Sequence, residues 1–194
     1  MNTIERVKNV LLVPKSEWQT ISEESDTHVK ILTTYLIPLA LIPAVASFIG
    51  YGLIGYSVMG VHVSTFGFGI REAVVSFIST IAGVYLTAWI ISFLADKFGS
   101  VKNFDNAFKL VAYSYTPMLI GGILLIFPKL AILVTIAGLY GLYLLYLGFV
   151  PVLKTPEDKK TSYFVVSLIC VVICSFIVSA IFTAILLPSA RVFI

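Results

Sequence analysis

Five stretches of mostly apolar residues alternate with short charged segments along the chain. They run near Ile31–Leu53, Ala73–Ala95, Leu110–Phe127, Leu130–Val150 and Tyr163–Leu187. A helix needs about 20 apolar residues to cross a bilayer core of about 30 Å. The pattern therefore predicts an all-α fold, in which residues 31–194 form a transmembrane domain of five helices.

The connections and prolines refine this prediction. Only Pro128 and Lys129 separate the third and fourth stretches, so these two helices are expected to lie antiparallel and adjacent. Pro38 and Pro43 interrupt the first stretch and Pro117 interrupts the third, and each proline removes a backbone hydrogen bond. Broken helices line binding sites in some transporters, but they also occur in structural bundles.

Residues 1–30 form a separate N-terminal segment with charges of both signs, which a cleaved secretory signal lacks. Ile4, Val7 and Leu11 share one face of a predicted helix that ends at Pro14. Ser16 is expected to start a second helix. In that helix Trp18 faces the headgroup layer, because short amphipathic helices beside a first span lie in the membrane interface.

Composition agrees with a membrane protein. The chain is 59% hydrophobic and 12% charged, with a mean hydropathy of +1.01, whereas soluble domains are about 25% charged. The formal net charge is +3, but the basic residues are dispersed over short loops and form no run that would bind nucleic acid. The loop from about Ile54 to Ile70 is nearly uncharged, and it is expected to be solvated, interfacial or re-entrant.

The lysines and arginines predict the orientation. Of the 13, four lie in residues 1–30 and six lie in the second and fourth loops, on the same side of the membrane. The other side has Arg71, Lys129 and Arg191. Because positive charge stays in the cytoplasm, the N-terminus is predicted to be cytoplasmic and the C-terminus outside.

Sequence motifs for chemistry are missing. There is no zinc-protease, nucleophile-elbow or phosphate-loop motif, and His28 and His62 have no second ligand in sequence. Cys170 and Cys174 are interpreted as small buried side chains. No span carries an ionisable residue deep within it, where such residues usually mark function. We therefore expect no catalytic residue, cofactor or metal.

Small and aromatic residues recur within the spans. Ser79, Gly83 and Thr87 form a stripe that favours close helix packing, within the chain or in a homo-oligomer. Tyr140 and Tyr143 form part of a tyrosine stripe in the fourth span, whose hydroxyls need partners if they are buried. Together with Tyr113 and Pro117 they are candidates for a polar cavity at a helix break.

Four blocks of sequence resemble the Yip family of membrane proteins, named for binding Ypt/Rab GTPases. They are Pro14-Lys15-Ser16-Glu17-Trp18, residues 109–117 with Tyr113-Ser114-Tyr115-Thr116-Pro117, residues 139–148 with their tyrosines, and the closing apolar helix. The resemblance implies five transmembrane helices, a cytoplasmic N-terminus and no catalytic residues. The short N-terminal segment is similar to that of the prokaryotic branch, which implies a plasma (inner) membrane.

Two functions follow from these observations. The first is a non-enzymatic scaffold or membrane-organising adaptor that contacts lipids and another membrane or cytoplasmic protein. Its candidate partner-binding residues are Trp18, Asn103, Asp105 and Lys109. The second is a small transporter, channel or lipid scramblase, which predicts a polar cavity reaching the midplane near Pro117 and Tyr143.

Overall fold

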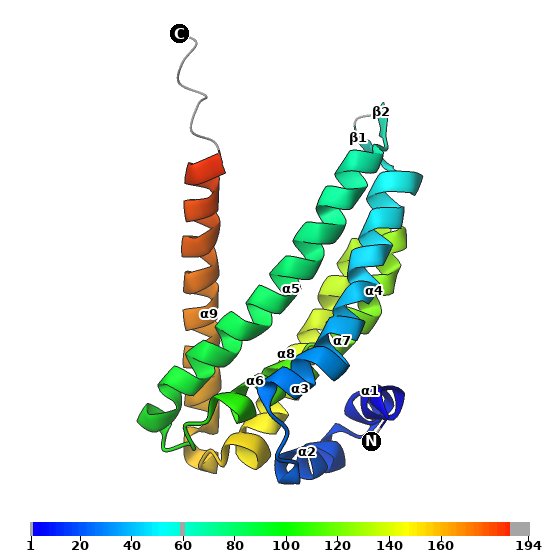
Figure 1. Ribbon diagram of the computed structural model, residues 1–194. Coiled ribbons are helices and arrows are strands. Elements are labelled where there is room, and N and C mark those ends of the chain that lie inside the picture. Colours follow the sequence, from blue (N-terminus) through cyan, green and yellow to red (C-terminus); the bar gives the residue numbers. More distant parts are fainter. Residues whose placement is uncertain (1, 59–60, 187–194) are drawn as a thin grey trace.

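The computed structural model describes residues 2–58 and 61–186, and Figure 1 shows their arrangement. Five helical spans are long and apolar enough to cross a membrane, as the sequence predicted. The first span contains α3 (His28–Ile31), η1 (Leu32–Leu36), α4 (Ile37–Ser47) and η2 (Phe48–Ile54), and the second contains α5 (Phe66–Leu94) and η3 (Ala95–Phe98). The third contains α6 (Phe104–Ser114), α7 (Thr116–Gly121) and η4 (Gly122–Ile126). The fourth contains η5 (Pro128–Leu130) and α8 (Ala131–Leu153), and the fifth is α9 (Glu157–Leu186). The predicted end of the fifth span, Leu187, lies outside the described residues.

The first span contains two π-helical segments. Both η1 and η2 are π-helical, and they flank α4, which has Pro38 in its first turn and Pro43 inside it. A proline leaves the carbonyl one turn earlier without its usual partner, and π-helical segments are frequent at functional sites.

The loop after the first span forms a short hairpin. Strands β1 (Tyr56–Val58) and β2 (Val61–Val63) pair antiparallel, with Ser57 opposite His62. The hairpin lies beyond the ends of α4 and α5, at the end of the molecule opposite α1 and α2 (Figure 1). This hairpin was not predicted from the sequence, because the glycines and aromatics of the loop do not alternate in a clear two-residue period.

The third span begins earlier than predicted and has a break. Asn103 caps α6 by accepting a hydrogen bond from the backbone N–H of Asn106 at 3.1 Å, so the helix begins at Phe104 and not near Leu110. The helix then breaks at Tyr115, and Pro117 lies in the first turn of α7, where its missing N–H costs little. This span is the most buried of the five, at 56%, against 11% for the fifth.

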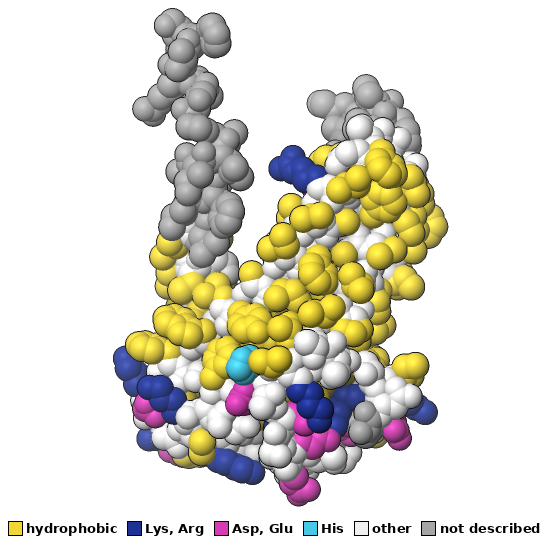
Figure 2. All heavy atoms as spheres, viewed as in Figure 1, with side chains coloured by type: hydrophobic (Ala, Val, Ile, Leu, Met, Phe, Trp, Pro, Cys, Tyr) yellow, Lys and Arg dark blue, Asp and Glu magenta, His cyan; other side chains and the backbone are white. Residues whose placement is uncertain are grey.

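The spans pack into an asymmetric bundle. Helix α4 contacts α5 and α7, while α6 lies between α5 and α8. Helix α9 contacts α5, η3 and α8, and stands apart from α4 (Figure 1). Charged side chains gather at the end that holds the N-terminal helices, and an apolar surface covers the spans above them (Figure 2).

The N-terminal helices lie against this charged end. Helix α1 (Thr3–Leu12) contacts α7, and α2 (Pro14–Glu23) packs along α8. Pro14 is the first residue of α2, so the predicted helix start at Ser16 was wrong. Proline suits the first position of a helix, because the N–H that it lacks would have no partner there. The Ser16 hydroxyl donates to the carbonyl of Val13 at 3.0 Å and does not cap α2.

Glycines allow the closest contacts between spans. A Cβ atom on Gly141 would lie 2.6 Å from the carbonyl oxygen of Ser114, and one on Gly122 would lie 2.6 Å from Cβ of Pro43. In the stripe that the sequence emphasised, Thr87 is buried but Ser79 is exposed. Gly50 faces the carbonyl of Leu125 and Gly69 faces Gly52 at least as closely, so glycines of the first four spans all contribute to close packing.

Candidate functional site

Trp18 holds α2 against the bundle. Its side chain is 1% exposed, and it meets Leu110 of α6 at Gly148 of α8, where a Cβ atom would lie 3.0 Å from the indole Cε2. The indole Nε1 has no hydrogen-bond partner among the described residues. The expectation that Trp18 lies in the headgroup layer was wrong, because an indole suits a buried contact as well as the interface.

A buried ion pair joins the two N-terminal helices. The Arg6 guanidinium donates to Glu17 at 2.5 Å and also to Glu24, and the side chains of Arg6 and Glu17 are 6% and 7% exposed. Burial by itself lowers the pKa of Arg6, but nearby Tyr113, Glu24 and Glu17 outweigh it and the pKa is raised. Such pairs are strongly destabilised when one partner is lost.

Lys109 ties the end of α2 to α6. It is 1% exposed, and its ammonium donates to the backbone carbonyls of Ile21, at 3.3 Å, and Glu24. These carbonyls lie at the C-terminal end of α2, where the helix dipole favours a cation. Lys109 is therefore not an exposed cation for a partner, as the sequence had suggested, but part of the internal contact.

Asp105 fixes the start of the first span. It accepts a hydrogen bond from the backbone N–H of His28 at 2.7 Å, and it lies 2.6 Å from His28 Nδ1. The His28 ring also packs edge-on against Phe104 and Phe108. Of the four predicted partner-binding residues, Asn103 is exposed and Asp105 is partly exposed, and both have structural roles at the start of α6.

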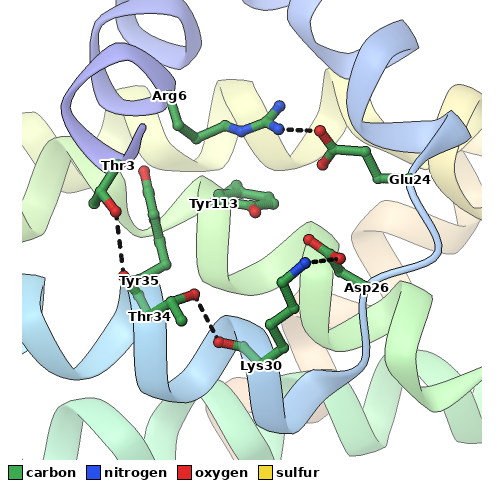
Figure 3. Close-up of a pocket in the computed structure, with 8 residues that line it drawn as sticks. All are labelled: Thr3, Arg6, Glu24, Asp26, Lys30, Thr34, Tyr35 and Tyr113. Atoms are coloured by element: carbon green, nitrogen blue, oxygen red, sulfur yellow. Dashed lines mark hydrogen bonds and ion pairs between the residues drawn. The ribbon is translucent and has the colours of Figure 1, made fainter. Parts of the chain in front are cut away.

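These contacts enclose a polar cavity of about 250 Å³ at the charged end of the bundle (Figure 3). Helix α1 contributes Thr3 and Arg6, and the connection between α2 and α3 contributes Glu24 and Asp26. The first span contributes Lys30, Thr34 and Tyr35, and α6 contributes Tyr113. Lys30 pairs with Asp26 at 2.6 Å at the mouth, where the Lys30 side chain is exposed and the Asp26 side chain is partly exposed.

Two tyrosines form the wall of the cavity that faces the bundle. The Tyr35 and Tyr113 rings meet edge to face with centroids 4.6 Å apart, and Arg6 lies 5.4 Å from the centroid of Tyr113. The Tyr35 hydroxyl is 2.7 Å from Oγ1 of Thr116, which donates to the carbonyl of Tyr113 at 2.6 Å. Thr116 thus satisfies a carbonyl at the helix break and positions Tyr35.

The other predicted cavity residues lie elsewhere. The Tyr140 hydroxyl donates to the carbonyl of Leu11 at 2.8 Å, and Tyr143 and Tyr140 line an open groove beside the start of α2. Pro117 is buried. A pocket of about 140 Å³ at the helix break is lined mainly by apolar groups; its lining residues are Ser114, Tyr115, Met118, Gly138, Gly141, Leu142 and Leu145. Only Tyr113 of the four reaches the polar cavity.

The charged groups of the cavity are nearly balanced. In residues 2–58 and 61–186, no three His, Cys, Asp or Glu side chains lie close enough together to hold a metal ion. The cavity has two cations and two carboxylates among its lining residues, so it is close to neutral overall.

Similarity to known proteins agrees with this architecture. The Yip1 domain matches residues 8–181. The chain belongs to the Yip1 domain family. A similar Yip1-type protein is Inner membrane protein YohC of Escherichia coli, in strains K12 and CFT073, each 26% identical over 155 residues that cover 77% of this chain and 80% of the relative. No solved structure matches the chain significantly.

The matched region of this Yip1 domain protein includes most of the cavity, and sequence reasoning missed several of its residues. Arg6 and Glu24 line the cavity and Glu17 pairs with Arg6, but in the sequence they stood out only as charges of the N-terminal segment. Their pairing across the turn between α1 and α2 leaves no periodic signal. Tyr35 falls within the first predicted span and was not singled out.

Proposed function

We propose that this Yip1 domain protein is a non-enzymatic membrane-organising adaptor of the bacterial inner membrane. The observation that carries the proposal is the docked N-terminal segment. Trp18, the Arg6–Glu17 pair and Lys109 hold α1 and α2 as a fixed platform on the end of the bundle. The relatives of known name are inner membrane proteins, which supports the location.

The platform presents a polar surface away from the bundle. Residues on the outer side of α2 are exposed, namely Ser16, Gln19, Thr20 and Glu23. A rigid polar surface loses little conformational entropy when it binds a partner. The adaptor role places the partner on this surface, and the buried Trp18 supports it from beneath.

A photo-crosslinking amino acid at Gln19 in cells tests this role. We expect a discrete protein adduct at Gln19, lost when Glu23→Lys is added, and none from the same amino acid at Ile70 near the opposite end. Both positions are exposed, so differences in reactivity reflect the neighbouring molecules. An absence of adducts at Gln19, or equal adducts at Ile70, would contradict the adaptor role.

A flux assay addresses transport. Purified protein in proteoliposomes is compared with empty vesicles for lipid scrambling and ion leak. The adaptor role predicts equal flux, and it is supported by the apolar lining of the pocket at the helix break. Protein-dependent flux that falls in Tyr143→Phe or Pro117→Ala would instead favour a transporter, channel or scramblase.

A further inference from the structure

We propose that the polar cavity beneath α1 binds the ammonium-bearing headgroup of a phosphatidylethanolamine lipid. The proposal does not depend on the adaptor role. It rests on the unsatisfied polar groups of the cavity, on its position relative to the apolar surface and on its size.

Two polar groups of the cavity have no hydrogen-bond partner within the described residues. The hydroxyl of Tyr113 makes no hydrogen bond to any of these residues and is open to the cavity that Tyr113 lines. Glu24 Oε2 is likewise without a hydrogen bond within the described part of the chain. Buried polar atoms are nearly always hydrogen-bonded, so the Glu24 oxygen needs a donor, and the Tyr113 hydroxyl can accept a hydrogen bond from a group that enters the cavity.

A primary ammonium is a donor of the right chemistry, because it offers three N–H groups. Glu24 already pairs with Arg6, so the ammonium would pair with Asp26 in place of Lys30. Lys30 lies at the mouth with its side chain 62% exposed, and its ion pair with Asp26 is weak enough to exchange for a phosphate. A phosphatidylethanolamine headgroup would place its ammonium inside the cavity and its phosphate beside Lys30 at the mouth.

The cavity also has the position and size of a headgroup site. The cavity extends from Asp26, before the first span, to Tyr35, which lies seven residues after His28, a rise of about 10 Å along a helix. It therefore lies where the charged end meets the apolar surface of the spans (Figure 2). The volume of about 250 Å³ would hold about eight water molecules at about 30 Å³ each, which suits a small headgroup whose acyl chains remain in the bilayer.

The test is native mass spectrometry of the full chain in micelles that contain equal amounts of phosphatidylethanolamine, phosphatidylcholine and phosphatidylglycerol with identical acyl chains. We expect retention of phosphatidylethanolamine over phosphatidylcholine, because a trimethylammonium donates no hydrogen bond. Tyr113→Phe and Asp26→Asn are expected to lower this preference roughly twofold to tenfold, the value of one hydrogen bond.

Two variants serve as matched controls. Tyr143→Phe removes a hydroxyl outside the cavity, and Asp96→Asn removes a carboxylate from an exposed pair with Lys102; both should retain the lipid as the wild type does. Circular dichroism checks that each variant is folded. Equal retention of the three lipids, or a preference unchanged in both cavity variants, would overturn the proposal.

Free O-phosphoethanolamine separates the two sources of the same headgroup. If it competes with the lipid adduct, or if only the lipid binds, the lipid site is supported. If O-phosphoethanolamine raises the melting temperature of the wild-type protein but not of Tyr113→Phe, while no lipid is preferred, the site takes a soluble ligand and the lipid proposal is wrong.

Discussion

The indole of Trp18 lies over Gly148, so close that a Cβ atom on the glycine would come within 3.0 Å of Cε2. The contact joins the second N-terminal helix to the fourth span, and it depends on the absence of a side chain at one position.

Gly148→Ala should therefore loosen the N-terminal helices. Overpacking a buried contact costs about 1–3 kcal/mol, and we expect a lower melting temperature with red-shifted fluorescence of Trp18, measured in a Trp89→Phe background. Gly138→Ala is the matched control on the same helix, because its Cβ atom would meet only Met118 Sδ at 3.9 Å. Equal shifts in both variants would show that the close contact does not matter.

Trp18→Ala should expose the connection between α2 and α3 to protease. Truncating a buried tryptophan costs about 3–5 kcal/mol, whereas Trp18→Phe should cost clearly less, since the indole N–H has no partner among the described residues. Limited proteolysis within residues 24–27 measures the difference. Trp89→Ala, at a position 57% exposed on the bundle surface, should leave the cleavage rate unchanged.

Arg6→Met should destabilise the protein by about 3–5 kcal/mol, because it leaves Glu17 buried without its cation. Adding Glu17→Gln should recover part of this loss, and the double-mutant cycle isolates the pair. Lys102→Met breaks an exposed pair with Asp96 and should cost less than about 1 kcal/mol. Similar losses of unfolding free energy in Lys102→Met and Arg6→Met would argue against a special role for the buried pair.

Asp105→Ala should loosen the start of the first span. It removes the acceptor of the His28 backbone N–H, with an expected cost of about 1–3 kcal/mol for the unpaired donor. Hydrogen exchange at residues 28–31 should increase, while exchange in α8 stays unchanged. Asp105→Asn keeps an oxygen acceptor and should have a smaller effect; a loss as large as that of the alanine variant would show that the negative charge itself is needed.

Cysteine labelling tests the orientation, which remains a prediction from the positive charges. In a background with Cys170→Ser and Cys174→Ser, Ser22→Cys should react with a membrane-impermeant maleimide only after the cells are permeabilised. Ser64→Cys, at the opposite end, should react in intact cells. The reverse result would place the N-terminal helices outside.

The five spans could be predicted from the sequence because hydropathy and length suffice to define a membrane-crossing helix. The start of α6 was missed since Asn103 gives its capping signal among charged residues that lower the hydropathy. The burial of Trp18 and Lys109 depends on partners about 90 to 130 positions away, at Ile21 and Gly148. No local pattern in one sequence records such pairings.

The hydrogen bond from the Tyr140 hydroxyl to the Leu11 carbonyl joins residues 129 positions apart. This separation has a consequence for biosynthesis. At about 5–20 residues per second, the ribosome makes α1 and α2 many seconds before α8 exists. During that interval α8 is not yet available to pack against the two N-terminal helices. Docking of the N-terminal helices is therefore a late event of assembly, and it reports that the first four spans have been inserted in register.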